Sequence, residues 1–395
     1  MICTVITGAT VFLATGPKDV QIRFEGDRVA ALAAEVPSQG CTMVDGSGKI
    51  LTAGFIEVSS QLGLVEVDLE GGTRDGDGGG DPIRAALVVA DAYNPRSTLI
   101  PIQRIEGITG AVTRPTGGMV SGQGAFVSLA GGSQAEAVQH RSVAMYAGIG
   151  GSSHAMGLLQ LRELLDDAAV YQKAKGAYDR NQTRAFYPGA SRLDLEALAP
   201  VVAGDLSLVI GADKASEIEA LIQLKADLGV KLVIHGAAEG WLLASELAAA
   251  DIPVIVDPYV YGPGSFGQIH GRADGPKLLA DAGVKVIFTT NASHNARNLG
   301  QVAGNAVRGG FDHDRAVDAI TRVPAEVFGL DGRGSIEVGA YADLVLWSAD
   351  PLEISTRVEH VWINGQDIAL ESRQTLLRDA YRTLPGTPKA PPELP

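Results

Sequence analysis

The chain has few cysteines and no long apolar run. Its 395 residues include only Cys3 and Cys41, with no CxxC motif or Cys/His cluster, which argues against a structural zinc site. We interpret both as buried thiols, with a disulfide between them as the minor alternative. No apolar run approaches the roughly 18 residues that a membrane-spanning helix needs. The sequence therefore indicates a globular protein without a membrane span.

Basic residues and a leader sequence are also scarce. Lys and Arg number 32 against 46 Asp and Glu, giving a formal net charge of −14. Nucleic acids and anionic membranes bind basic surfaces, so this balance argues against both as partners. The N-terminal MICTVITGATVF lacks the basic segment and long apolar segment of a signal peptide. We predict a cytoplasmic protein, or a periplasmic one if a leader has been removed.

Short strands are predicted at both ends of the chain. VITGATVFL, VQIRFEGDRVAAL and GKILT are β-rich runs within the first fifty residues, separated by Gly-Asp and Gly-Ser-Gly turns. Near the other end, ADLVLW (342–347) and VEHVWING (358–365) have the same character. We expect these terminal segments to pair into one small β-sandwich. The tail from Leu384 contains too many prolines for regular structure.

The centre of the chain alternates strands with helices. Strand-like LSLVI (206–210) precedes ASEIEALIQLKADLG, a predicted helix with a capping box at Ser216 and Glu219 and an end at Gly229. KLVIH (231–235), PVIVDP and VKVIFTT continue the strands. These runs are apolar throughout, which is typical of parallel strands buried on both faces.

Strand–helix units recur about every 20 to 30 residues, the spacing of βα repeats. We therefore predict an α/β fold, a (β/α)8 TIM barrel with a small β-sandwich built from both termini. The expected boundaries are 1–54 and 333–383 for the two parts of the sandwich, 55–332 for the barrel and 384–395 for the tail.

A glycine-rich acidic segment, DLEGGTRDGDGGGD, spans residues 68–81. Asp75, Asp77 and Asp81 are candidate Ca²⁺ ligands, but their spacing fits no EF-hand. A plain loop is the favoured interpretation, and Ca²⁺ binding stays open. The later PTGGMVSGQG (115–124) presents many backbone N–H groups but lacks the Lys of a P-loop, so we expect tight turns there.

Several phrases resemble the amidohydrolase superfamily, in particular its imidazolonepropionase-like branch. VDGSGKILTAGFIE (44–57) is similar to the entry into the first barrel strand, and PAEVFGL (324–330) with GSIEVGAYADLVLW (334–347) to the exit from the barrel. IHGAAEGWLLASELAAADIPVI (234–255) and SHNARNL (293–299) fit the same branch. The resemblance covers nearly the whole chain and implies the barrel-and-sandwich fold.

The resemblance also implies a divalent metal that lowers the pKa of a bound water and polarises a carbonyl. Its ligands in the family are an H-x-H pair on strand 1, a carboxylated Lys or an acid after strand 4, His on strands 5 and 6, and Asp on strand 8. No lysine near residues 183–188, including Lys173 and Lys175, matches the bridging position.

At the other ligand positions this sequence departs from the family pattern. Ser59 and Gln61 stand where the paired histidines fall, and Gly211 where the strand-5 histidine falls. Asn291 stands at the aspartate position, or Ala292 if the strand is shifted by one. His235 alone is retained. Neutral oxygen donors bind Zn²⁺ far more weakly than imidazole, and neither Asn nor Ala can act as a general base.

Three histidines and one arginine remain as candidates. His235 is a possible remnant ligand or general base, and the alternative is a hydrogen-bonded histidine filling the barrel mouth. His294 is a candidate to face the pocket with Arg297, against a structural role in its loop. His270 lies in a glycine-flanked loop after strand 7, where it either lines the site as part of a lid or is simply solvated.

Two functions follow. We favour a catalytically impaired pseudo-hydrolase without a cofactor, acting as a binding or partner subunit. Its expected partners are a metal-competent amidohydrolase relative or further copies of itself, with a small-molecule ligand possible. The alternative is an active amidohydrolase that cleaves C–N bonds of cyclic amides or peptide-like amides. It would use Zn²⁺ or another divalent ion on His235, or a metal-free mechanism.

Overall fold

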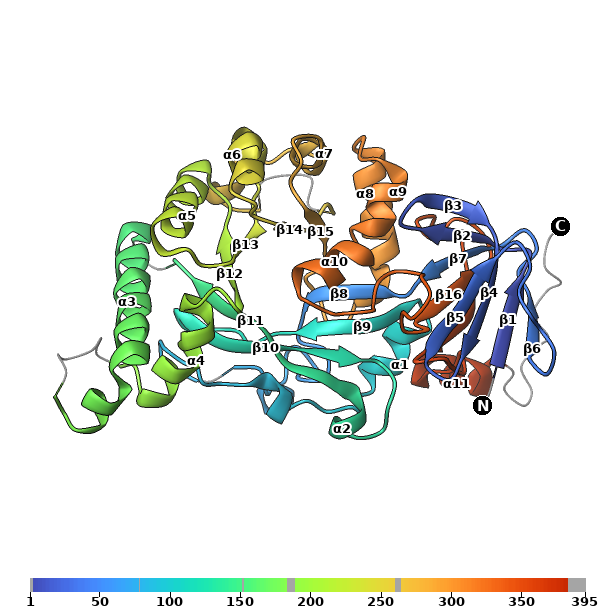
Figure 1. Cartoon of the computed structure of the whole chain (residues 1–395), viewed down its shortest axis with the longest axis horizontal. Coiled ribbons are helices and arrows are strands. Elements are labelled where there is room, and N and C mark those ends of the chain that lie inside the picture. Colours follow the sequence, from blue (N-terminus) through green and yellow to red (C-terminus); the bar gives the residue numbers. More distant parts are fainter. Residues whose placement is uncertain (1–2, 78, 151–152, 183–188, 260–263, 383–395) are drawn as a thin grey trace.

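The computed structural model describes residues 3–77, 79–150, 153–182, 189–259 and 264–382. A barrel with helices around it occupies most of the molecule, and two further sheets lie at one end (Figure 1). The predicted TIM barrel with a sandwich from both termini is confirmed. The predicted irregular tail from Leu384 lies outside the described residues.

The barrel is an eight-stranded sheet whose strands are neighbours in chain order. All run parallel except β10, which is antiparallel to both of its neighbours. The turn before β10 contains Gly117 and Gly118, both with positive φ, as the tight-turn prediction requires. The barrel strands are β8 (Phe55–Ser60), β9 (Ile108–Thr113), β10 (Val120–Ser128), β11 (Val138–Gly148), β12 (Ser207–Ala212), β13 (Leu232–Gly236), β14 (Val254–Val256) and β15 (Val286–Phe288).

The barrel closes between β15 and β8 through two residues that follow the last outer helices. The amide of Phe288 donates to the carbonyl of Ala319 at 3.1 Å, and the amide of Ile56 donates to the carbonyl of Ile320 at 2.8 Å. The first and last strand ends therefore lie close enough for their loops to share a site.

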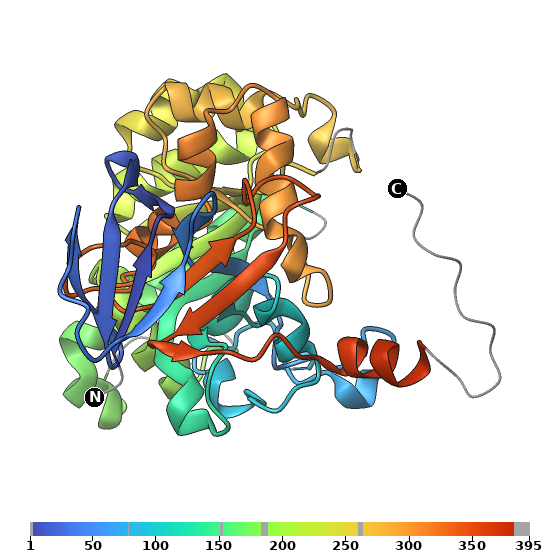
Figure 2. The ribbon, with the colours of Figure 1, turned by 90° about the vertical axis from the view of Figure 1, so that its right-hand side faces the viewer.

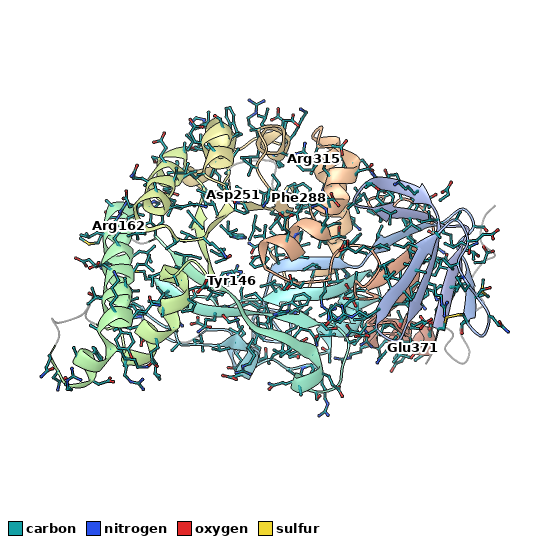
Figure 3. The ribbon with its side chains drawn as sticks, viewed as in Figure 1. Tyr146, Arg162, Asp251, Phe288, Arg315 and Glu371 are labelled. Atoms are coloured by element: carbon teal, nitrogen blue, oxygen red, sulfur yellow. A yellow bond between two sulfur atoms is a disulfide. The ribbon has the colours of Figure 1, made fainter. Side chains whose placement is uncertain are left out.

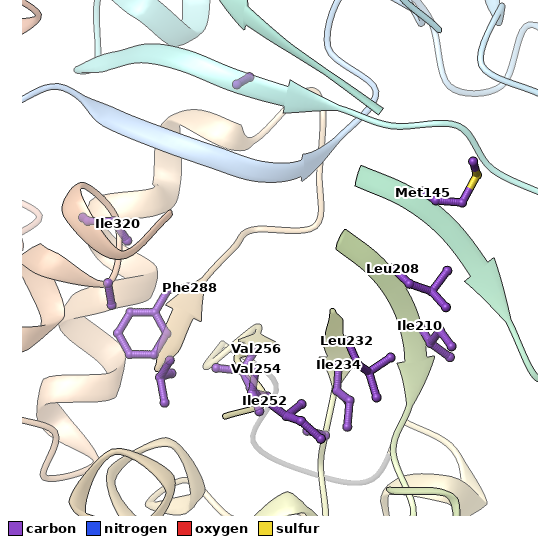
Figure 4. Packing of buried hydrophobic residues seen from close by; sticks show 14 of the residues in the cluster. Met145, Leu208, Ile210, Leu232, Ile234, Ile252, Val254, Val256, Phe288 and Ile320 are labelled. Atoms are coloured by element: carbon purple, nitrogen blue, oxygen red, sulfur yellow. The ribbon is translucent and has the colours of Figure 1, made fainter. Parts of the chain in front are cut away.

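Both faces of the barrel strands are buried, as their continuous apolar runs predict. Leu208, Ile210, Leu232 and Ile234 belong to the cluster that packs beneath the helices (Figure 4). The alternate residues point into the barrel interior and form a second cluster, which also includes apolar residues of α10 (Arg322–Val327). Its strand residues include Ile56, Val58, Val112, Phe126, Val209, Val233, Ile255 and Ile287.

Helices cover the outside of the barrel. The helices are α1 (Leu99–Arg104), α2 (Gln134–Ala137), α3 (His154–Asp179), α4 (Arg192–Val202), α5 (Ala215–Leu228), α6 (Ala244–Ala249), α7 (Gly275–Asp281), α8 (Leu299–Arg308), α9 (His313–Asp318), α10 (Arg322–Val327) and α11 (Arg373–Tyr381). Among the described residues, none of these helices is long and apolar enough to cross a membrane.

The start of α5 corrects the predicted capping box. The helix begins at Ala215, so Ser216 already lies inside its first turn. The carboxylate of Glu217 instead accepts the amides of Asp213, at 3.2 Å, and Lys214, at 3.4 Å. The predicted end is confirmed, because Gly229 is the C-cap with φ +72°.

The sandwich combines strands from both ends of the chain (Figure 2). One sheet consists of N-terminal strands alone, and the other contains strands from both ends. The first has the order β5-β4-β1-β6 and the second β18-β17-β16-β7-β2-β3, where β7 pairs antiparallel with β16. The strands are β1 (Cys3–Thr7), β2 (Thr10–Leu13), β3 (Gly16–Asp19), β4 (Gln21–Glu25), β5 (Arg28–Ala33), β6 (Thr42–Asp45), β7 (Ile50–Ala53), β16 (Leu344–Trp347), β17 (Val358–Ile363) and β18 (Gln366–Asp367).

The sequence interpretation of the cysteines as buried thiols is wrong. Cys3 and Cys41 form the disulfide that was the minor alternative. The reason is the register of the sheet. Strands β1 and β6 run parallel with Thr4 opposite Thr42, which places the two preceding residues side by side with Cα atoms 4.6 Å apart. That separation is within the range that a disulfide spans.

Candidate binding site at the barrel mouth

Three of the predicted site residues meet at the carboxyl ends of the barrel strands. Ser59 lies near the end of β8, His235 near the end of β13, and Asn291 follows β15. The hydroxyl of Ser59 lies 3.3 Å from Nε2 of His235 and donates to Oδ1 of Asn291 at 3.1 Å. Asn291 has a positive φ of 50°. These side chains thus form one hydrogen-bonded group from strands far apart in sequence.

A fourth member of this group, Arg114, was missed by the sequence analysis. It directly follows β9, and its amide donates to the carbonyl of Ser60 at 2.9 Å. Its Nε donates to Oγ of Ser59 at 2.8 Å, and its Nη2 donates to Oδ1 of Asn291 at 3.1 Å. The guanidinium therefore lies between two of the positions where the family resemblance expects metal ligands.

The charge of Arg114 acts on its neighbour His235. Burial, together with a smaller effect of the positive charge of Arg114, lowers the pKa of His235 from 6.5 to about 4. The imidazole is therefore neutral at physiological pH.

Glu57 holds the two strand ends together below this group. Its side chain is fully buried. One carboxylate oxygen accepts the amide of Ser59 at 2.9 Å and the hydroxyl of Thr289, and the other accepts both the amide and the hydroxyl of Thr290, at 2.9 and 2.7 Å. Burial raises the pKa of Glu57, and these hydrogen bonds oppose the shift. Glu57 thereby fixes the backbone that carries Ser59 and Asn291.

Tyr146 lies on β11 (Figure 3), near enough to Arg114 for the charge of the guanidinium to act on its phenol. Its hydroxyl is buried and has no hydrogen-bond partner among the described residues. Burial raises the pKa of this phenol, and the charge of Arg114 opposes the rise. Tyr146 is thus a neutral group that adds no negative charge beside Arg114.

Gly211 and Gln61 lie close to the group without joining it. Gly211, in β12, is in register with His235, and a Cβ added there would meet only the carbonyl oxygen of His235, at 4.0 Å. The side chain of Gln61 donates from Nε2 to the hydroxyl of Thr116 at 3.3 Å, and its backbone N–H donates to Oγ of Ser293 at 2.9 Å. Space for a larger side chain therefore exists at Gly211.

Of His294 and Arg297, predicted to face the pocket together, only His294 lines a cavity at the barrel mouth. Nε2 of His294 lies 3.1 Å from the carbonyl of Glu66, and Nδ1 lies 3.1 Å from a carboxylate oxygen of Asp68. Arg297 points away, donating from Nη1 to Oε1 of Gln374 in α11 at 3.0 Å. His294 precedes the short 3-10 helix Ala296–Asn298 and Arg297 lies within it, and each side chain is held by its own partners on different segments.

His270 is exposed, and it is absent from the residues that line the cavities described below. The carbonyl of His270 accepts a hydrogen bond from the indole of Trp241 at 2.9 Å. Of the two interpretations of His270, the contacts favour the solvated one.

Two cavities open at the barrel mouth. The larger, of about 560 Å³, lies over the ends of β12, β13 and β14 and is lined by residues including Gly211, Asp213 and His235. The smaller, of about 210 Å³, is lined by Ser59, Ser60, Gln61, Asp68, Arg114, Asn291, Ala292, Ser293, His294 and Asn295. Asn291 lines both cavities, so the hydrogen-bonded group stands between them.

The donor set at the mouth does not fit a divalent metal. It offers one imidazole, one hydroxyl and one carboxamide oxygen, and the last two are already bonded to a guanidinium. Zn²⁺ sites are built from His, Cys, Asp and Glu, and nowhere in the described part of the chain do three such residues group together. A cation at Arg114 would also repel a second positive ion.

The remaining features considered from the sequence, the acidic segment and the lysines of α3, contribute no described residue to this hydrogen-bonded group. Asp77 pairs with Arg84 at 3.1 Å, and Asp81 accepts the amide of Ile83 at 3.1 Å, so both aspartates have structural contacts within the chain. Lys173 and Lys175 lie in α3, where the ammonium of Lys175 pairs with Glu196. The neighbouring residues 183–188 lie outside the described residues.

The depressed pKa of His235 predicts how stability depends on pH. Between its ordinary pKa of 6.5 and about 4, the unfolded chain binds a proton at His235 and the folded chain does not. The free energy of unfolding should therefore fall as pH falls through this window, by about 3 kcal/mol at most. Urea unfolding of the wild type and of His235→Asn at several pH values checks this. Equal losses in both proteins would contradict it.

Comparisons with known proteins agree on the fold. A model of the amidohydrolase family matches residues 268–368. An amidohydrolase of Thermotoga maritima MSB8 superposes with a TM-score of 0.84 at 23% identity, over 93% of this chain and 99% of that one.

Two curated relatives are also similar. Amidohydrolase tasK of Hapsidospora irregularis is 21% identical over 84% of this chain, which spans only 38% of the length of that relative. N-acyl-D-glutamate deacylase of Alcaligenes xylosoxydans xylosoxydans is 42% identical over 62 residues, 13% of either protein. The resemblance to the amidohydrolase superfamily is thus confirmed. The imidazolonepropionase-like branch is compatible with these matches and stays a prediction.

Proposed function

We propose that this protein is a metal-independent binding protein with an amidohydrolase fold, catalytically impaired as a metal hydrolase. The observation that carries the proposal is the position of Arg114. Its guanidinium bonds Ser59 and Asn291, which stand at two expected ligand positions. A fixed organic cation there supplies positive charge but no water of lowered pKa, which is what the family's metal contributes.

A zinc titration tests this proposal. Isothermal titration calorimetry of the purified wild type with Zn²⁺ should show no tight site. The matched control restores the family's donors with Ser59→His, Gln61→His, Gly211→His, Asn291→Asp and Arg114→Ala, and it should bind about one Zn²⁺ per chain. A wild type that binds one Zn²⁺ as tightly as the restored variant would contradict the proposal.

The alternative, metal-free hydrolysis of C–N bonds in cyclic or peptide-like amides, is favoured by one observation. Oγ of Ser59 lies 3.3 Å from Nε2 of His235, a serine–histidine pair within reach of proton transfer. Against it, the same hydroxyl donates to Asn291, and His235 is a weak base. Covalent labelling of Ser59 by a fluorophosphonate that is abolished in His235→Ala would support the metal-free hydrolase. A wild type whose Ser59 is not labelled would rule out this alternative.

A role as a partner subunit would explain why the fold persists without a catalytic metal. We propose as its partner a metal-competent relative or a second copy of this chain. Purification from the native host tests this, and recovery of a monomer with no barrel-fold partner would count against it.

The disulfide between Cys3 and Cys41 bears on location. Disulfides persist in oxidising compartments, which supports a periplasmic or other extracytoplasmic location over the cytoplasmic one. Two reactive thiols per chain, in protein purified from its native host and denatured without a reducing agent, would contradict this location.

A further inference from the structure

The guanidinium of Arg114 has hydrogen-bonding capacity left over. An arginine side chain carries five N–H donors. The single N–H on Nε and one of the two on Nη2 are used by Ser59 and Asn291, which leaves three, on Nη1 and Nη2. Among the described residues, none accepts a hydrogen bond from Nη1. The remaining donors therefore form the open end of the planar fork.

The positive charge of Arg114 is also unpaired. Among the described residues no Asp or Glu oxygen lies within 4.0 Å of its guanidinium, and its two bonded partners are neutral. The two fully buried arginines do have such partners: Arg84 pairs with Asp77, and Arg333 with Asp343. A half-buried cation is costly unless an anion accompanies it. In a chain of net charge −14 this one lacks an internal counterion.

From these two observations we propose that the 210 Å³ cavity binds a small monocarboxylate, which the open fork of Arg114 holds by two parallel hydrogen bonds. The planar fork matches the geometry of a carboxylate. The proposal deepens the proposed function, because it requires that no metal takes the place of Arg114.

The other residues of the cavity limit the ligand to one negative charge. Asp68 lines the same cavity, where it already faces His294, and its carboxylate would repel a second anionic group. The remaining wall is polar, with Gln61, Ser293 and Asn295, and suits hydrogen bonding to a neutral amide or hydroxyl on the ligand. A dicarboxylate is therefore a poorer fit than a monocarboxylate.

The test compares two molecules that differ only in charge. Calorimetric titration with N-acetylglycine should show saturable binding at one site, and N-acetylglycinamide should bind about tenfold or more weakly. Arg114→Gln should lose binding of N-acetylglycine by at least the same factor, and Arg114→Lys, which keeps the charge without the fork, should lose part of it. Circular dichroism and thermal unfolding establish that each variant is folded.

Arg297→Gln is the matched control. Like Arg114, Arg297 follows a barrel strand, in its case β15, and bonds a neutral oxygen, but it lines neither cavity, so its replacement should leave binding unchanged. The proposal is overturned if N-acetylglycine does not bind the wild type, or if Arg114→Gln and Arg297→Gln weaken its binding equally. It is also overturned if Arg114→Lys and Arg114→Gln both bind N-acetylglycine like the wild type. Equal displacement of N-acetylglycine by inorganic phosphate would overturn the carboxylate assignment. A metal-free protein that fails to bind N-acetylglycine refutes this inference and leaves the proposed function standing.

Discussion

Glu57→Ala should destabilise the protein by about 4 kcal/mol or more. The substitution removes the acceptor of four donors, the amides of Ser59 and Thr290 and the hydroxyls of Thr289 and Thr290, inside a fully buried site. Each unsatisfied buried donor costs about 1 to 3 kcal/mol. Urea unfolding followed by circular dichroism measures the loss.

Two control variants separate lost hydrogen bonds from lost volume. Glu57→Gln keeps the shape and one acceptor oxygen, so it should cost only about 1 to 2 kcal/mol. Glu359→Ala, at a half-exposed carboxylate paired with Lys49, should change stability by less than about 0.5 kcal/mol. A Glu57→Ala variant as stable as Glu359→Ala would refute the role given to Glu57.

Arg333→Met should cost about 3 to 5 kcal/mol. Arg333 and Asp343 form a buried ion pair, with side-chain exposures of 3% and 7%. The guanidinium also donates to Gln139 at 3.2 Å and to Asn364 at 3.1 Å, so it ties the barrel to the sandwich. Removal of one partner leaves an uncompensated buried charge. Thermal and urea unfolding measure the loss.

The pH dependence distinguishes this mechanism from lost packing. Burial raises the pKa of Asp343 and Arg333 lowers it, so without the arginine the carboxyl should be protonated more easily. The variant's folded-state pKa then lies above its unfolded value, and its stability should fall as pH rises through that window. Arg333→Met should therefore be less destabilising at pH 5 than at pH 8, and adding Asp343→Asn should recover part of the loss. An equal loss at both pH values, unchanged by Asp343→Asn, would indicate packing alone.

The convergence of Ser59, His235 and Asn291 was predictable because each follows an apolar run, and parallel strands of a barrel end at one mouth. Arg114 also follows such a run, but no ligand is expected on that strand, and a single arginine after a strand carries no specific signal. Its contacts depend on the distance between strand ends, which only the folded barrel sets.

The disulfide and the start of α5 were mispredicted for similar reasons. Whether Cys3 meets Cys41 depends on the register of β1 against β6, a long-range pairing that composition does not encode. The capping box at Ser216 failed because β12 ends at Ala212 and the helix starts at Ala215, which makes Glu217 the residue that reaches the free amides. Both errors concern boundaries and registers, whereas the periodicity of the apolar residues predicted the elements themselves.

The central claim is that a guanidinium, and not a metal ion, supplies the positive charge at the barrel mouth. Inductively coupled plasma mass spectrometry tests it most directly, on protein purified from medium supplemented with Zn, Mn and Fe and dialysed against metal-free buffer. The account predicts well below about 0.1 metal ion per chain in the wild type and about one in the restored variant. About one tightly held ion per chain in the wild type would contradict it and return the metal hydrolase to first place.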